Sequence, residues 1–301
     1  MKSGRYRLRW GLLCAVAVLT CGPAIAQITT NTALPVARGQ GIVRLQMKYL
    51  RSTGDATAAD RGVRVLAFPV VGVYGITAKL AAFGVFPILD KSLDVTMPQG
   101  RITRSTSGLG DVRLFARYTV VQFNRRGLLM RLAPFAGLEL PTGATGAMDR
   151  KGRLPRTLQR GSGSWDPFVG VVLTRQSFAW QVDISASYQF NTEADAFTFG
   201  DEVRLDMATK VRLLPRSLGH GLPRFLYVNL ETNLIRQDEN RVGAVVDGNS
   251  GGTTWYAAPG LQYVTRRMIL EAAVQLPVVQ DLNGTALENN LITTLSLRVS
   301  F

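Results

Sequence analysis

The sequence is poor in the residues that most often carry catalysis. Its 301 residues include only two cysteines and one histidine. Both cysteines, Cys14 and Cys21, lie within residues 1–26, so the rest of the chain has no thiol for a disulfide, a nucleophile or a metal ligand. The histidine, His220, lies between two glycines in a predicted turn, where we interpret it as a loop residue. The sequence therefore predicts no enzymatic activity, no catalytic residue, no cofactor and no metal.

Long apolar runs are also missing after residue 26. No stretch approaches the roughly 20 apolar residues of a membrane-spanning helix, and no window shows the i, i+3, i+4, i+7 stripe of an amphipathic helix. Nevertheless, 46% of the residues are hydrophobic. Strands that alternate apolar and polar residues can place this many apolar side chains on one face without any long run. The composition therefore favours an all-β fold.

Residues 1–26 have the organisation of a secretory signal. Basic residues come first, an apolar run follows over 10–20, and a small-x-small cleavage motif ends at Ala26. The apolar run is too short to span a membrane as a helix. We therefore expect export and cleavage after Ala26. A lipoprotein with an acylated Cys21 is an alternative, which the preceding Thr20 disfavours.

The chain is strongly basic, with a formal net charge of +14. Removing residues 1–26 removes four positive charges and no negative one, which leaves about +10. In a soluble protein such an excess would suggest a nucleic-acid partner, but export argues against that partner. In an outer membrane, positive charge would meet lipopolysaccharide phosphates or a passing anion. The alternative is a generally basic surface without a specific partner.

The final stretch, 289–301, has a clear strand pattern, because its odd-numbered residues from Leu291 to Phe301 are mostly apolar and its even-numbered ones mostly polar. The closing strand of an outer-membrane barrel commonly ends on an interfacial aromatic that the assembly machinery reads. We therefore assign Phe301 as an assembly signal and expect the barrel assembly machinery as a partner. An edge strand of a soluble sandwich is the alternative.

The same period of two recurs in twelve segments. These are 38–51, 61–74, 78–90, 108–122, 128–141, 164–175, 178–190, 200–214, 223–236, 253–265, 267–279 and 289–301. Long connections follow the odd strands and short ones the even strands, which is typical of outer-membrane barrels with outer loops and short periplasmic turns. The sequence thus predicts an all-β protein: a single antiparallel transmembrane β-barrel of about 12 strands over 38–301. Residues 27–37 are expected to form a periplasmic lead-in, and the location to be the bacterial outer membrane.

Individual segments differ in clarity. Segment 178–190 is the clearest, with aromatic residues at both ends of its apolar face, as expected where a lipid-facing strand meets the two membrane interfaces. Segment 61–74 is apolar on both faces and harder to interpret. Residues 91–107 are expected to be a longer polar loop.

If the apolar faces point to lipid, the opposite faces line the lumen. The charged candidates there are Arg44, Lys48, Arg113, Arg117, Arg131, Glu139, Asp183, Arg204, Asp206, Lys210, Arg212, Glu231, Glu271 and Arg298. Their mixed signs fit either a salt-bridged interior that braces the barrel or a wet channel with a positive bias. Twelve strands lie between the eight of filled barrels and the sixteen or more of open porins, so we expect a narrow or plugged pore.

The longest predicted loop, 142–163, is basic. Its candidates for a constriction or for lipopolysaccharide binding are Arg150, Lys151, Arg153, Arg156 and Arg160. The loop could fold into the lumen or bind phosphates from outside, and a plainly solvated loop is the alternative.

Several motifs together resemble one family, the outer-membrane transporters associated with the MetA pathway of phenol degradation. They are Gly108-Leu109-Gly110-Asp111, Leu140-Pro141-Thr142-Gly143, Gly161-Ser162-Gly163-Ser164-Trp165-Asp166, Ala258-Pro259-Gly260-Leu261-Gln262-Tyr263 and Val274-Gln275-Leu276-Pro277-Val278. The resemblance covers roughly residues 60–301. It implies a barrel that passes small molecules, including hydrophobic or aromatic ones, and it brings no catalytic residues.

Passive transport of a small-molecule solute is therefore the leading functional hypothesis. A closed structural or surface barrel that binds lipopolysaccharide through basic outer loops is the alternative. An outer-membrane hydrolase is a third and more remote hypothesis.

Overall fold

The computed structural model describes residues 29–98, 100–216 and 224–301. The predicted signal sequence with its cleavage point, and His220, lie outside these residues. Within the described ranges the fold is all-β, and no helix is long and apolar enough to cross a membrane.

The described elements are nineteen strands and one short 3-10 helix. They are β1 (Gly41–Ser52), β2 (Gly62–Gly75), β3 (Leu80–Met97), β4 (Gly100–Leu109), β5 (Val112–Tyr118), β6 (Val121–Arg125), β7 (Leu128–Leu140), β8 (Met148–Asp149), β9 (Gly152–Arg153), η1 (Arg156–Leu158), β10 (Asp166–Ser177), β11 (Trp180–Gln189), β12 (Phe197–Thr198), β13 (Glu202–Leu214), β14 (Phe225–Gln237), β15 (Asn240–Val242), β16 (Val245–Asp247), β17 (Gly252–Val264), β18 (Met268–Leu282) and β19 (Asn289–Ser300).

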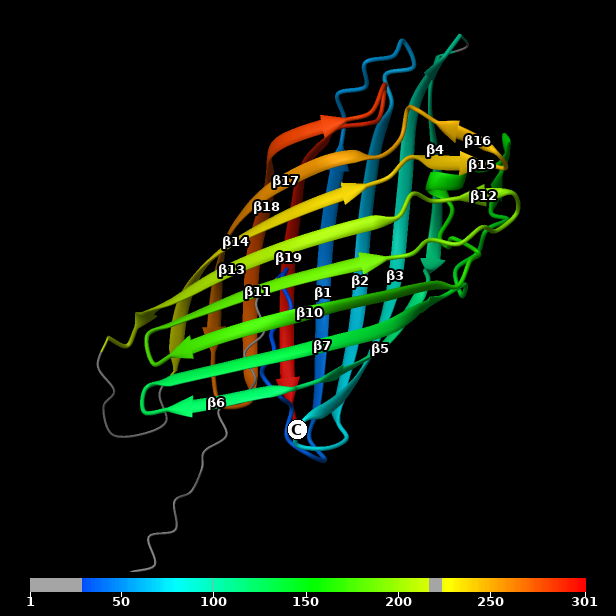
Figure 1. The fold of residues 1–301 in the computed structure, drawn as a ribbon. Helices are drawn as coiled ribbons and strands as arrows, with labels where there is room; N and C mark the ends of the chain where they lie inside the picture. Colours follow the sequence, from blue (N-terminus) through cyan, green and yellow to red (C-terminus); the bar gives the residue numbers. More distant parts are fainter. Residues whose placement is uncertain (1–28, 99, 217–223) are drawn as a thin grey trace, which may run out of the picture.

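The main sheet closes into a barrel (Figure 1). Neighbours along the chain pair antiparallel, β10 pairs with β7, and β19 pairs with β1 to close the ring. Strands β4, β5 and β6 are successive parts of one barrel strand, because β4 and β5 both pair with β3 while β5 and β6 both pair with β7. Counted this way, the barrel has twelve strands, which confirms the prediction.

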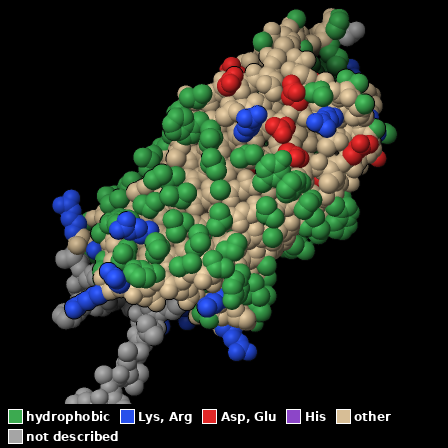
Figure 2. Space-filling view, in the orientation of Figure 1, with side chains coloured by type: hydrophobic (Ala, Val, Ile, Leu, Met, Phe, Trp, Pro, Cys, Tyr) green, Lys and Arg blue, Asp and Glu red, His purple; other side chains and the backbone are tan. Residues whose placement is uncertain are grey.

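The burial pattern is inverted relative to a soluble protein. On β11, Ile184 is 48% exposed while its neighbour Asp183 is fully buried. The same alternation recurs along the other barrel strands, so the outer surface is an apolar band (Figure 2). Apolar side chains facing lipid and polar side chains facing inward are the expected arrangement of a transmembrane barrel.

One connection differs from its prediction. Residues 91–107, expected to be a polar loop, instead form a hairpin in which β3 continues to Met97 and β4 begins at Gly100. Both faces of this hairpin are rich in polar residues because it extends beyond the apolar band. These residues therefore do not alternate between apolar and polar, and without that alternation a strand could not be predicted here.

The two ends of the barrel differ in structure. Strands β2 and β3, β6 and β7, β10 and β11, β13 and β14, and β17 and β18 are joined at one end, which we call the short-turn end. The other end, the long-loop end, carries the small sheet β12–β15–β16, the β8–β9 hairpin and η1 (Figure 1).

The barrel seam closes at the short-turn end. The backbones of Gly41 and Phe301 exchange two hydrogen bonds, of 2.9 and 3.0 Å. The Phe301 ring lies against the Cα of Gly41, where an added Cβ would come within 2.5 Å of the ring. Phe301 is otherwise 76% exposed on the outer side.

Candidate functional site

One half of the lumen wall is polar and internally hydrogen-bonded. It is formed by β11, β13, β14, β17, β18, β19 and β1. Its centre is Glu271, which is 4% exposed and accepts ion pairs of 3.0 Å from both Arg44 and Arg298. Ser296 and Gln262 also donate to this carboxylate, at 2.8 and 2.7 Å. A buried carboxylate with this many partners braces the wall, since a buried charge is tolerated only when it is paired and hydrogen-bonded.

A second cluster lies on β13 and β14. The Arg204 guanidinium donates to Asp206 at 2.9 Å, and the Asn233 amide donates to Asp206 at 2.6 Å. Gln275 on β18 donates to Asn233 at 2.8 Å and so connects the cluster across β17. These contacts fill the polar half with protein groups.

All fourteen charged residues proposed to line the lumen lie on the inward face of their strands, but they are not one cluster. Arg113 pairs with Glu139 at 2.5 Å, and Arg131 donates to the carbonyls of Phe123 and Met130. Lys48, Lys210 and Arg212 form no ion pair with any described residue; Lys210 and Arg212 lie over the rings of Tyr227 and Phe225. Of the remaining three, Arg117 and Glu231 contact another segment of the chain, and Asp183 is linked to it through Thr174.

That segment comprises residues 29–37, which precede β1 and lie inside the barrel. Glu231 accepts hydrogen bonds from the Thr29 amide at 2.8 Å, the Thr29 hydroxyl at 2.5 Å and the Thr30 amide at 3.1 Å. Thr174, itself hydrogen-bonded to Asp183, accepts from the Ala33 amide at 2.7 Å. The segment is thus fixed to two sides of the wall.

Arg117 holds the same segment from β5. Its guanidinium donates to the carbonyls of Thr32 and Leu34, and to the Asn31 side chain at 2.9 Å. Thr30, Thr32, Ala33, Leu34 and Val36 are each at most 7% exposed. We call residues 29–37 the inner segment. Over these residues the expected lead-in is therefore not a free tail, because its backbone amides and carbonyls have partners on the lumen wall.

The other half of the lumen wall is mainly apolar, apart from Arg113, Arg117, Arg131 and Glu139 on β5 and β7. The inward-facing residues of β2, β3, β5, β7 and β10 include Ala67, Pro69, Val71, Val73, Ala81, Phe83, Val85, Pro87, Leu89, Phe115, Ala133, Phe135, Phe168 and Val172. This half explains why segment 61–74 is apolar on both faces: one face of β2 contacts lipid and the other lines the apolar part of the lumen.

Four phenylalanines form the centre of the apolar half. The rings of Phe83 and Phe115 stack with centroids 4.4 Å apart and planes 9° from parallel. Phe115 also contacts Phe135 and Phe168, at 6.0 and 5.8 Å between centroids. Sequence reasoning missed these residues because it searched the inward faces for charge. Apolar residues at the inward-facing positions of neighbouring strands could have indicated this part of the wall.

Two cavities lie along this apolar half. The larger, about 410 Å³, opens toward the long-loop end; apolar residues such as Pro69 and Val85 line one side of it, and most of its other lining residues are polar or charged, among them Arg113 and Glu139. The smaller, about 160 Å³, lies beside the inner segment and is lined by Val71, Phe83 and Phe115 on its apolar side. Three arginines, Arg44, Arg117 and Arg298, also line it. On β2, β3 and β5, the residues that line the smaller cavity lie directly next to those that line the larger cavity along the inward face of the strand. The two cavities therefore follow one another along the barrel.

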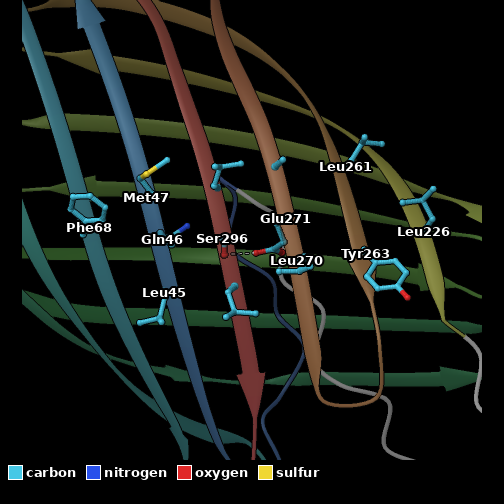
Figure 3. A pocket seen from close by; sticks show the side chains of 13 residues that line it. Leu45, Gln46, Met47, Phe68, Leu226, Leu261, Tyr263, Leu270, Glu271 and Ser296 are labelled. Carbon is cyan, nitrogen blue, oxygen red and sulfur yellow. Dashed lines mark hydrogen bonds between the residues drawn. The ribbon is translucent and has the colours of Figure 1, made fainter.

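A third hollow lies on the outside of the barrel. Leu45, Met47 and Phe68 line it together with Leu261 and further residues of β14 to β19 (Figure 3). These apolar side chains belong to the lipid-facing set, whereas Glu271 and Ser296 at its floor bond to each other. We assign this groove to contact with lipid.

The five basic candidates of loop 142–163 lie at the long-loop end and are divided between two roles. Arg153 and Arg156 contact Asp195 at 3.5 and 3.1 Å, and Arg160 donates to the Ser107 carbonyl at 2.5 Å, so these three hold loops together. Arg150 and Lys151 are exposed and form no ion pair with described residues. Among the described residues, no group of three or more His, Cys, Asp and Glu side chains could hold a metal ion.

The fold is similar to that of a solved outer membrane channel from Pseudomonas putida F1, with a TM-score of 0.68 at 14% identity over 91% of this chain and 100% of that chain. A second similar structure is the β domain of the Bordetella autotransporter BrkA, with a TM-score of 0.45 at 14% identity over 88% of this chain and 100% of that chain. A third is the monoaromatic hydrocarbon channel CymD, with a TM-score of 0.41 at 10% identity over 88% of this chain and 89% of that chain. The comparison with curated proteins gave no match.

A family model described as "Putative MetA-pathway of phenol degradation" matches residues 51–278. This range includes every barrel strand from β2 to β17 and most of β18. The match thus covers far more than half of the chain, and the protein belongs to this family.

Proposed function

We propose that the protein is an outer-membrane barrel through which small hydrophobic or aromatic molecules pass without energy coupling. The observation that carries this proposal is the apolar half of the lumen, where the smaller cavity lies against the stacked rings of Phe83 and Phe115 and the larger cavity follows it along β2 and β3. Membership of a family named for phenol degradation and a fold shared with an outer membrane channel support it.

The chemistry of the two wall halves fits an apolar solute. An apolar cavity of about 150 Å³ is large enough for benzene, so the smaller cavity is of a suitable size for one aromatic ring. Around Glu271 the polar half has its hydrogen bonds within the wall and does not need a solute to satisfy them. A sugar or an ion would have to give up water against the phenylalanine rings, which offer no hydrogen bonds in return, and this is costly.

The inner segment narrows the route. It lines the smaller cavity through Thr30, Leu34 and Val36, so a solute leaving that cavity toward the short-turn end must pass beside it or displace it. Because the segment is held mainly by hydrogen bonds to side chains, displacement requires no break in the barrel wall.

A second candidate is a closed surface barrel that binds lipopolysaccharide. The buried inner segment favours a closed lumen, and the exposed Arg150 and Lys151 favour phosphate binding at the long-loop end. We also propose that the barrel assembly machinery inserts the chain through β19 and Phe301. The presence and cleavage of the signal at 1–26 is part of the same proposal.

Uptake of a labelled aromatic compound separates the two candidates. Cells that express the protein should take up submicromolar toluene or phenol several-fold faster than cells without it. Phe115→Asn should remove most of that increase, because the amide places an unpartnered polar group on the apolar side.

The matched control is Ser187→Asn, which places the same amide on the polar half of the lumen and should leave uptake close to the wild-type rate. Equal uptake with and without a correctly inserted barrel would refute transport and favour the closed barrel. Equal losses in the two variants would show that the apolar half does not guide the solute.

A further inference from the structure

The positive charge of the barrel is concentrated at the short-turn end. Ten Lys and Arg residues lie in or beside the short turns, and we call them the basic rim. They are Arg38, Lys79, Arg125, Arg126, Arg175, Arg212, Arg216, Arg224, Arg266 and Arg267. None of the chain's Asp or Glu residues lies among these turns. Of the 35 Lys and Arg, four lie in residues 1–26 and ten in the rim, and the remaining 21 equal the 21 Asp and Glu.

The two ends also differ in whether their charged side chains form ion pairs. At the long-loop end, Arg61 pairs with Asp55 at 2.8 Å and Arg104 with Asp149 at 2.8 Å, among several such bridges. No rim residue forms an ion pair with any described residue, and nine of the ten are exposed. In Figure 2 the acidic residues lie at one end together with some basic ones, whereas the other end shows basic residues only. The rim therefore carries ten charges that the protein itself does not neutralise.

The rim lies where the apolar band ends. Exposed aromatic side chains mark this border, among them Phe178 at 71%, Tyr74 at 55% and Tyr118 at 47%. Two rim guanidiniums lie over border rings: Arg125 over Phe123 and Arg175 over Trp180, each 5.2 Å from the centroid. Aromatic rings at the border and long basic side chains beyond it are typical of the membrane interface. This places the guanidiniums at the level of lipid headgroups.

We propose that the basic rim is a docking surface for anionic phospholipid headgroups of the inner leaflet of the outer membrane. Arginine matches phosphate with paired donors and a permanent charge, and clustered basic residues beside a membrane attract anionic lipids. The proposal concerns the rim at the short-turn end, where Arg212 is also on the inward face of its strand, and it holds whatever passes through the lumen.

The distribution of the rim favours lipid over an acidic protein partner. Each of the five short turns and the chain entry at Arg38 carries at least one cation, so the charge encircles the barrel. A protein partner would need a patch on one side, with an apolar centre from which charge is depleted. A ring of separate cations instead offers many equivalent sites, one for each neighbouring lipid.

Counting bound lipids tests the proposal. The full-length protein is purified in a neutral detergent, mixed with phosphatidylglycerol or with zwitterionic phosphatidylcholine, and analysed by native mass spectrometry. The rim variant replaces Arg125, Arg126, Arg266 and Arg267 with Gln. It should retain less than half as many phosphatidylglycerol molecules as the wild type, with little change for phosphatidylcholine.

The matched control replaces four exposed cations of the long-loop end, Arg51, Arg150, Lys151 and Arg241, with Gln and should retain wild-type numbers. Heat-modified mobility on a gel checks that both variants fold. Equal retention by the rim variant and the wild type, or equal loss in both variants, overturns the proposal.

A second readout distinguishes lipid from soluble anions. The protein is placed in nanodiscs containing phosphatidylglycerol and offered polyglutamate or inorganic phosphate. If headgroups occupy the rim, the wild type and the rim variant should bind polyglutamate equally, and likewise inorganic phosphate. Polyglutamate binding that the rim variant abolishes would show that the cations face the aqueous phase and serve an acidic protein, and it would overturn the lipid proposal.

Discussion

Replacing Glu231 with Ala should release the first residues of the inner segment from the lumen wall. One carboxylate oxygen of Glu231 accepts from the Thr29 amide, the Thr29 hydroxyl and the Thr30 amide, at 2.5–3.1 Å. A hydrogen bond to a charged group contributes about 1.5–3 kcal/mol, and three on one oxygen are not additive, so we take about 3 kcal/mol for the set. Since each 1.4 kcal/mol is a factor of ten, the population with Thr29 and Thr30 displaced should rise about 100-fold.

A single engineered thiol can measure this displacement, because the described residues contain no cysteine. Thr30 is suitable: it is 3% exposed and its hydroxyl has no hydrogen-bond partner, so Thr30→Cys removes no bond. Labelling by a membrane-impermeant maleimide should be slow in this variant and about 100-fold faster when Glu231→Ala is added. Glu231→Gln, which keeps an acceptor oxygen without the charge, should lie between the two.

The control thiol is Ala273→Cys, at a buried position on the lumen wall that is not opposite Glu231. Its labelling rate should not respond to Glu231→Ala, which would exclude a general loosening of the barrel. If Thr30→Cys reacts at the same rate with and without Glu231, these hydrogen bonds do not hold the inner segment, and the reasoning from the contacts is refuted.

Three further predictions concern the outer face and the loops. Ile184→Arg, on the lipid face of β11, should lower the free energy of unfolding by about 2–4 kcal/mol in urea titrations if the site is near the bilayer midplane. Val245→Arg, in the exposed β16, should change that free energy by less than about 0.5 kcal/mol. Equal losses in the two variants would contradict the assigned lipid face. Trypsin added to intact cells should cleave at Lys151 and leave the short turns uncut, and the reverse pattern would invert the orientation. The Arg61 guanidinium holds the pKa of the Asp55 carboxyl well below its usual value of about 3.9. The stabilisation that this pair gives the loop is therefore fully present above about pH 4 and is lost as the pH falls further. The NMR chemical shift of the Asp55 carboxyl carbon should titrate at a lower pH in the wild type than in Arg61→Gln.

Most of the barrel could be predicted from the sequence because each lipid-facing strand must be apolar on one side and its lumen face is usually polar. Strand β11 is the clearest case, with Ile184 exposed and Asp183 buried as its alternation predicts. The rule failed where one of these conditions was absent. The β3–β4 hairpin has no lipid to face, so residues 91–107 show no alternation, and β2 faces apolar groups on both sides.

The interior could be predicted only in part. The sequence shows charged residues at inward positions such as Glu271. It does not show which of them form pairs, because pairing depends on the register between strands that are distant in the chain. The inner segment could not be placed, because residues 29–37 carry no strand or helix pattern and are held by single contacts such as those of Arg117. The four phenylalanines in contact likewise belong to four different strands, and only closure of the barrel brings them together.

The most direct test of transport along the apolar half of the lumen is to locate an aromatic solute inside the barrel. The protein in outer-membrane vesicles would be exposed to a small aryl diazirine, irradiated, digested and mapped by mass spectrometry, with and without an excess of phenol. Adducts on Phe83, Phe115 and Phe135 that disappear with excess phenol are the predicted result. Adducts confined to lipid-facing residues such as Ile184, and unchanged by phenol, would contradict the proposal that such molecules enter the lumen.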